Sequence, residues 1–109
     1  MAAQADGPLL VWMTTDDPVE AWRLARGAVA ERLAASAHVT PTRSCYRWQG
    51  DLHEADEHLV ALRTRRSVYA ALEAWIRARH HYVLPEIIAL PIAAGLEPYL
   101  DWIVDATRS

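Results

Sequence analysis

Several residue types are absent from this sequence of 109 residues. It contains no lysine, no asparagine and no phenylalanine, whereas arginine and alanine are frequent. All three missing residues are encoded by AT-rich codons, so a GC-rich genome explains their absence better than selection for guanidinium chemistry does. The arginine content therefore does not indicate an anion-binding surface, because charged residues usually form a solvated face.

Cysteine is scarce, and long apolar runs are missing. Cys45 is the only cysteine, which excludes an intramolecular disulfide and is typical of a reducing compartment. Residues 1–7 have neither the basic region nor the apolar core of a signal peptide. No apolar run approaches the ~18 residues that a membrane span needs. We therefore expect a cytoplasmic protein without a membrane partner.

The remaining composition is typical of a globular domain. Apolar residues make up 52% of the chain and charged residues 23%, which argues against a disordered protein. The net charge of −3 argues against a nucleic-acid partner, since such proteins usually carry a basic surplus on one face. We expect residues 1–7 to form a short flexible segment and residues 8–109 to form a single domain.

The first expected elements are a strand and a helix. The apolar run at residues 9–13 predicts a buried strand. Asp17, Pro18 and Glu20 suit the N-cap, N1 and N3 positions of a helix that ends near Ser36. The apolar stripe of this helix is expected at Val19, Trp22, Ala25, Val29 and Leu33.

A long β-hairpin is expected next. Its arms are residues 38–48 and 52–64, and Gly50 can supply the positive φ that the turn requires. Ser67 is expected to cap a second helix. The apolar face of that helix consists of Val68, Leu72, Trp75 and Ile76.

The chain ends with a strand at residues 86–92 and a short helix at residues 98–107. The order βαββαβ, with two right-handed crossovers, predicts an α+β fold. We expect a ferredoxin-like sandwich with both crossover helices on one sheet face, an extended β-hairpin and a C-terminal helix. The first and third strands are then central, and Pro91 falls on an edge strand, where proline is tolerated.

Two features conflict with a monomer. The strands at residues 9–13 and 87–92 do not alternate apolar and polar residues, so both of their faces need cover. A hairpin arm spans roughly 36 Å at ~3.3 Å per residue, whereas the first helix reaches only about 28 Å at ~1.5 Å per residue. We therefore expect a trimer in which copies cover each other's sheets and the tip carrying Tyr46 and Trp48 clasps a neighbour. The alternative is that the tip is a mobile loop.

Four motifs follow one another in a characteristic order. They are Tyr46-x-Trp48-x-Gly50, Leu62-Arg63-Thr64, His80-x-Tyr82-x-x-Pro85-Glu86 and Tyr99-x-x-Trp102. In this order they resemble the CutA divalent-ion-tolerance family from about Leu9 to Thr107. The resemblance implies a compact homotrimer of a ferredoxin-like subunit, with sheets facing inward and hairpins reaching across. The chain departs from the family pattern at Arg63, commonly Lys, at His81, commonly Pro, and at Ser36, often Cys.

The histidines show no strong metal-ligand spacing. His53 and His58 should face opposite sides of a strand, and the adjacent His80 and His81 should point apart. These last two can be read simply as histidines at a helix terminus. The resemblance associates the position of His80, and a cysteine at the position of Ser36, with copper and other divalent ions, although a hydroxyl is a weak ligand for soft metals. The metal candidates are therefore His80 and His81, for copper or zinc, and no cofactor is expected to be required.

A ligand cleft between subunits is the other candidate site. It would be lined by Trp48, Arg63, Tyr82, Glu86 and Trp102, with an ion pair between Arg63 and Glu86. The alternative is that these aromatic residues form the interface core. The trimer architecture also resembles that of PII signal-transduction proteins, which bind small effectors in intersubunit clefts, but this is an analogy of fold alone.

Catalysis has the least support. Cys45 has no general base or orienting group that the sequence reveals, and no phosphate loop or dinucleotide motif occurs. The expected function is that of a CutA-like homotrimeric binding or regulatory protein, not an enzyme, associated with tolerance of divalent metal ions such as copper. The alternative is a PII-like signalling trimer that binds a small effector.

Overall fold

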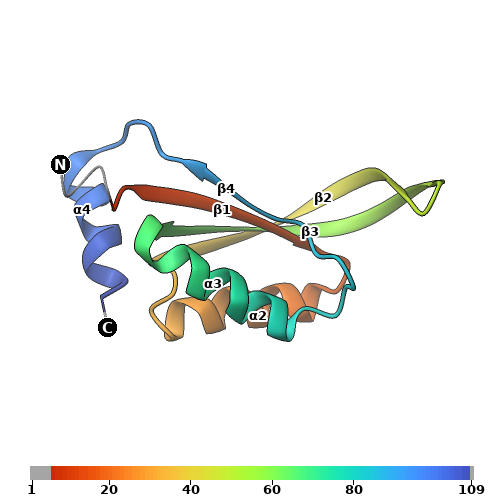
Figure 1. Ribbon diagram of the computed structural model, residues 1–109, viewed down its shortest axis with the longest axis horizontal. Coiled ribbons are helices and arrows are strands. Elements are labelled where there is room, and N and C mark those ends of the chain that lie inside the picture. The colour runs from red at the N-terminus through yellow and green to blue at the C-terminus, as the bar shows by residue number, and fades with distance from the viewer. Residues whose placement is uncertain (1–5, 109) are drawn as a thin grey trace.

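The computed structural model describes residues 6–108, in which a four-stranded antiparallel sheet carries helices on one face (Figure 1). The strand order is β2-β3-β1-β4, so the first and third strands are central, as predicted. Residues 1–5 of the expected flexible segment lie outside the described residues. The elements are β1 (Pro8–Thr15), α2 (Pro18–Ala30), β2 (Ser36–Trp48), β3 (Asp51–Arg65), α3 (Arg66–Arg79), β4 (Ile87–Pro91) and α4 (Glu97–Ala106).

Helix α2 begins as expected but turns a different face to the core. The Asp17 side chain accepts hydrogen bonds from the backbone N–H groups of Val19 (2.9 Å) and Glu20 (3.3 Å), which confirms the N-cap. The predicted stripe was wrong at Val19, which is 72% exposed, and at Trp22, which is 59% exposed, but right at Ala25, which is buried. Three alanines and Leu24 face the core, whereas Val19 and Trp22 lie on the solvent side of the helix. The buried face consists of Glu20, Ala21, Leu24, Ala25 and Ala28.

The same helix is shorter than predicted. It ends at Ala30, and Arg32 has a φ of 59°, in the left-handed region that a continuing helix does not use. Leu33 then packs against the edge of the core. The shortened end of α2 lies at the end of the sheet where β2 begins, away from the hairpin tip (Figure 1).

The hairpin has the predicted turn and the predicted overhang. Strands β2 and β3 stay paired out to Trp48 and Asp51, and Gln49 and Gly50 between them have φ values of 51° and 86°. Two successive residues with positive φ are typical of a type I′ turn. The hairpin projects well past both α2 and α3 (Figure 1), and the longest dimension of the subunit is 45 Å.

Helix α3 is held at its start by another segment. Its N-cap is Arg65, without a side-chain hydrogen bond, so the expected cap at Ser67 was wrong. The N–H of Ser67 instead donates to Asp6 Oδ1 (2.8 Å), and Asp6 also pairs with Arg65. Leu72 and Ile76 are fully buried, as predicted.

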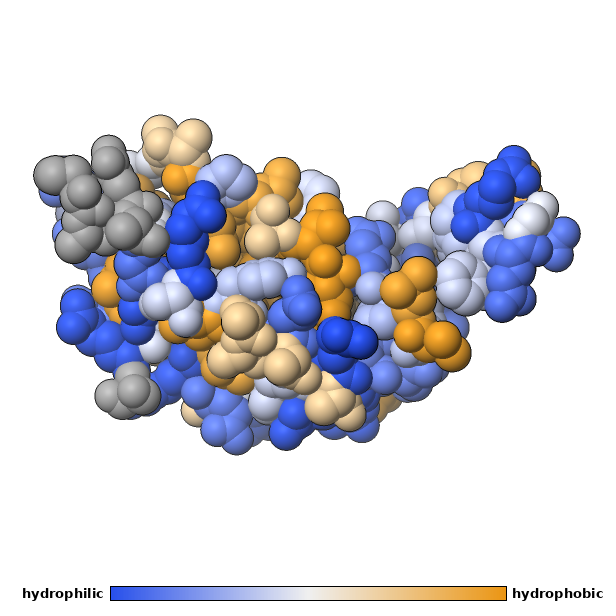
Figure 2. Space-filling view, in the orientation of Figure 1, coloured by the Kyte–Doolittle hydropathy of each residue, from blue (hydrophilic) through white to orange (hydrophobic). Residues whose placement is uncertain are grey.

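The sheet face away from the helices is open and apolar. In the pairing of β1 with β4, Trp12 lies opposite Ile88 and Leu10 opposite Leu90. Ile88 is 46% exposed and Leu90 is 40% exposed. Figure 2 shows hydrophobic residues gathered over β1 and β4. Within residues 6–108, no helix is long and apolar enough to cross a membrane.

Candidate functional site

Glu20, His80 and His81 converge at the end of α3. His80 leaves the helix with φ −76° and ψ 138°, and the chain then turns toward the first turn of α2, which carries Glu20. The two imidazole rings stack with centroids 5.5 Å apart, so the prediction that they point apart was wrong. Each residue offers one atom that could bind a metal ion, and these three atoms all lie within 4.8 Å of one another. In the described part of the chain, no other three metal-ligating side chains come together in this way.

The Glu20 carboxylate is the centre of this cluster. It is 3% exposed and accepts hydrogen bonds from Thr15 Oγ1 (2.6 Å), from the backbone N–H of His81 (3.1 Å) and from His81 Nδ1 (2.6 Å). Burial alone would raise the pKa of Glu20. The hydrogen bonds from Thr15 and His81 and the charge of the His81 ring outweigh burial and hold that pKa below its ordinary value.

His81 bridges two carboxylates. Its Nδ1 faces Glu20, and its Nε2 lies 3.1 Å from Asp16 Oδ1. The hydrogen bond to Glu20 raises the pKa of His81; burial opposes this, but the charges of Glu20 and Asp16 add to the increase. Because each ring nitrogen faces a carboxylate oxygen, the geometry favours the doubly protonated imidazolium, in which both nitrogens donate.

His80 is bound differently and is buried. Its Nε2 donates to the carbonyl oxygen of Thr14 (2.8 Å), and its Nδ1 accepts from the backbone N–H of Tyr82 (3.1 Å). A carbonyl only accepts and an amide N–H only donates, so these contacts select the neutral ring protonated on Nε2. The Nδ1 of His80 lies 3.8 Å from Glu20 Oε2. A metal ion bound to this nitrogen would have to displace the hydrogen bond that the backbone N–H of Tyr82 donates to it.

Two imidazoles and a carboxylate are a suitable ligand set for zinc or copper. A divalent ion between Glu20 and His81 would have to replace the proton on His81 Nδ1, because a ligating imidazole is neutral. Sequence reasoning treated Glu20 only as an N3 residue. No local signal in the sequence reveals this role of Glu20, because the spacing of large apolar residues predicts a different buried face for α2.

The other side chains considered as metal ligands lie away from the cluster of Glu20, His80 and His81. Ser36, at the start of β2, is 3.4 Å from the Tyr99 hydroxyl. Cys45 is exposed on the hairpin. His53 stacks on Tyr46 with centroids 5.4 Å apart, also on the hairpin. None of these residues belongs to the group formed around Glu20.

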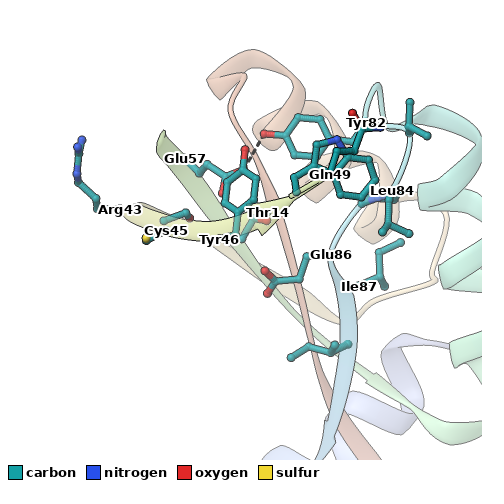
Figure 3. Close-up of a pocket in the computed structure, with 15 residues that line it drawn as sticks. Thr14, Arg43, Cys45, Tyr46, Gln49, Glu57, Tyr82, Leu84, Glu86 and Ile87 are labelled. Atoms are coloured by element: carbon teal, nitrogen blue, oxygen red, sulfur yellow. Dashed lines mark hydrogen bonds between the residues drawn. The ribbon is translucent and has the colours of Figure 1, made fainter. Parts of the chain in front are cut away.

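Three of the five predicted cleft residues do come together within one subunit. Trp48, Tyr82 and Glu86 line a cavity of about 930 Å³ between the hairpin and the segment that leads into β4 (Figure 3). Arg63 and Trp102 do not line it. Arg63 Nη1 instead lies 3.0 Å from His38 Nδ1, and within the described chain no ion pair joins Arg63 to Glu86.

Sequence reasoning missed a second carboxylate in this cavity. The hydroxyl of Tyr82 donates to Glu57 Oε2 at 2.6 Å, the contact drawn as a dashed line in Figure 3. Burial and the neighbouring Glu57 raise the pKa of Tyr82, so the hydroxyl keeps its proton and remains a donor. The alternation of residues along β3 does not reveal Glu57, because its burial comes from a loop distant in sequence.

Comparison with known proteins gives one consistent family. The family model described as CutA1 divalent ion tolerance protein matches residues 9–106. The divalent-cation tolerance protein CutA of Thermus thermophilus is 39% identical over 99 residues, which is 90% of this chain and 96% of that protein. A solved structure of the divalent cation tolerance protein Cut A1 from Thermus thermophilus superimposes with a TM-score of 0.90 at 38% identity, covering 93% of this chain and 99% of the other.

Eukaryotic relatives are longer. The chloroplastic protein CutA of Arabidopsis thaliana is 35% identical over 102 residues, covering 93% of this chain. The chain spans 56% of the length of that relative and 57% of the length of the chloroplastic CutA 1 of rice.

Proposed function

The chain belongs to the CutA1 divalent ion tolerance protein family, and on that premise we propose that it is a homotrimeric metal-binding or regulatory protein rather than an enzyme. The observation that carries the proposal is the convergence of Glu20, His80 and His81 on one point. The metal ion we propose first is copper, with zinc as the second choice, because both accept imidazole and carboxylate ligands.

The open sheet face supports the trimer. Ile88 and Leu90 are exposed apolar residues on a sheet face that no described helix covers, and a soluble monomer rarely leaves such a patch uncovered. The projecting hairpin gives each ferredoxin-like subunit an arm that can reach a neighbour. A patch of this kind, repeated around a symmetry axis, is a common basis for closed homo-oligomers.

The state of assembly can be tested by light scattering coupled to size-exclusion chromatography. The proposal expects a mass close to three times 12.2 kDa at micromolar concentration. A stable species near 12.2 kDa would contradict it.

The metal site can be tested by calorimetric titration of the purified protein with Cu²⁺ and with Zn²⁺. Binding should strengthen as the pH rises through the raised pKa of His81, because the ion displaces the proton from that ring. Loss of an outer-shell partner of a metal ligand typically weakens metal affinity by roughly 10- to 100-fold. His81 and Glu20 would contact the ion directly, so His81→Ala and Glu20→Gln should each weaken metal binding by at least that factor.

His53→Ala provides the matched control, since His53 lies on the hairpin away from the cluster. It should leave the affinity unchanged. Equal loss in His53→Ala and His81→Ala, or full affinity in His81→Ala, would reject the assignment of the site.

The relatives compared carry CutA names, so they give no support to the PII-like alternative. A cytoplasmic location stays a prediction, and two of the longer plant relatives are named as chloroplastic.

A further inference from the structure

The two helices that cover the sheet present a basic surface. Every exposed charged residue of α2 and α3 is an arginine, although the chain as a whole has a net charge of −3. The acidic residues of these helices are engaged, since Glu20 is buried in its cluster and Glu73 accepts a hydrogen bond from the Tyr69 hydroxyl (2.8 Å). Arginine content alone does not indicate an anion site, but this concentration on one layer attracts anions. The residues concerned are Arg23, Arg26, Arg66, Arg77 and Arg79.

Two of these arginines border a notch between α2 and α3, which lie side by side on one face of the sheet (Figure 1). The notch has a volume of about 350 Å³. It is lined by Arg23, Leu24, Gly27, Trp75 and Arg79. None of these residues is among those that we assign to contacts between subunits, and the open apolar face of the sheet lies on the opposite side.

Packing holds the Arg79 side chain in place. Its guanidinium lies over the Trp75 ring, 4.3 Å from the ring centroid, and its Nη1 donates to the Trp75 carbonyl oxygen (3.0 Å). The ring packs closely on α2, because a Cβ at Gly27 would lie 2.6 Å from it. A guanidinium has five N–H donors, so the remaining ones can bind an oxyanion. Within residues 6–108, no carboxylate pairs with Arg79.

Arg23 brings a second guanidinium to the notch. Its Nη2 lies 3.6 Å from Glu20 Oε1, which is longer than a hydrogen bond, and its side chain is 64% exposed. The same carboxylate oxygen already accepts the backbone N–H of His81 at 3.1 Å. The pairing with Glu20 is therefore loose, and it leaves the N–H donors of Arg23 available to a ligand.

From these contacts we infer that the notch binds a small organic carboxylate, with its charge between Arg23 and Arg79 and its apolar body against Trp75. A guanidinium suits a carboxylate because two parallel N–H groups match its two oxygens. The volume of about 350 Å³ is at the lower end of the range of small-molecule sites. The inference does not require a metal ion at the cluster around Glu20.

Calorimetric titration of the whole chain, in low salt and without added metal, tests the inference with three probes. Phenylacetate carries both a charge and a ring, phenylacetamide keeps the shape without the charge, and acetate keeps the charge without the ring. Phenylacetate should bind roughly tenfold to a hundredfold more tightly than phenylacetamide, as expected for hydrogen bonds to charged groups. It should also bind more tightly than acetate, and added salt should weaken it. Equal affinity for phenylacetate and either of the other probes overturns the inference.

Variants assign the site. Arg79→Gln removes the guanidinium that lies over Trp75, so the preference for phenylacetate over phenylacetamide should disappear. Arg23→Gln should reduce that preference. Arg77→Gln is the matched control, because Arg77 is exposed on the same helix but does not line the notch, and it should bind as the wild type does. Unchanged affinity in Arg79→Gln, or an equal loss in Arg77→Gln, overturns the inference.

Two further outcomes are decisive. If Arg79→Gln does not fold, a reduced preference for phenylacetate in Arg23→Gln supports the site, and a full preference there overturns it. If the wild type does not bind phenylacetate at millimolar concentrations, the inference is overturned as well.

Discussion

Replacing Glu20 by glutamine should destabilise the protein in a way that depends on pH. The carboxylate is 3% exposed and accepts three hydrogen bonds, two of them from His81. Glutamine can still accept from Thr15, but it loses the charge that the imidazolium faces. A hydrogen bond to a charged group contributes about 1.5–3 kcal/mol. His81 is 47% exposed, so solvent screening reduces the loss, and we expect about 2 kcal/mol.

The direction of the pH dependence follows from the two shifted pKa values. The pKa of Glu20 is lowered from 4.5, so its contribution is present above pH 4.5 and is lost as the pH falls through the lowered pKa. The pKa of His81 is raised from 6.5, so its contribution is fully present below pH 6.5 and is lost as the pH rises through the raised pKa. The contact stabilises the fold most between these two values.

Urea denaturation of wild type and Glu20→Gln at one protein concentration, at pH 6 and again near pH 9, measures this effect. A fixed concentration is needed because the stability of an oligomer depends on it. The cost of the variant should be largest at pH 6 and shrink toward pH 9. Glu31→Gln, at the exposed end of α2, is the control. A cost under about 0.5 kcal/mol, or one equal at both pH values, would refute the reasoning.

Three other substitutions probe packing and assembly. Trp48→Ala should cost about 3–5 kcal/mol per ring buried against a neighbour and should promote dissociation; an unchanged melting temperature and mass would refute the clasping hairpin. Gly27→Ala should destabilise by about 1–3 kcal/mol despite better helix propensity, because a Cβ there would lie 2.6 Å from the Trp75 ring; thermal melts showing a gain would contradict this packing. Ile88→Asp should yield monomers in light scattering if the open face is an interface, and a trimer of unchanged stability would place the interface elsewhere.

Much of the fold follows from local chemistry in the sequence. Asp17 provides a side-chain acceptor where a helix begins, and Gly50 provides positive φ where the hairpin turns, so both elements could be located without tertiary contacts. The apolar face of α2 could not be located in this way. Its core side is made mainly of small alanines, and the larger Val19 and Trp22 lie outside, so the spacing of large apolar residues favoured the wrong face.

The candidate site was predicted only in part. His80 and His81 are visible as adjacent histidines, but their convergence depends on the backbone turn after α3 and on Glu20, a carboxylate far earlier in the chain. Likewise, Tyr82 and Glu86 were expected in a cleft, whereas Glu57 was not, because its burial arises from contact with Tyr82. Contacts between segments distant in sequence determine both sites.

Electron paramagnetic resonance of bound Cu²⁺ tests the central claim most directly. At pH 7.5 the wild-type protein should bind one Cu²⁺ per chain, with coupling to imidazole nitrogen in the spectrum. In the double variant Glu20→Gln/His81→Ala, this stoichiometric signal should be lost while the fold is retained. An unchanged nitrogen-coupled signal in that variant would contradict the assignment of the metal site to Glu20, His80 and His81.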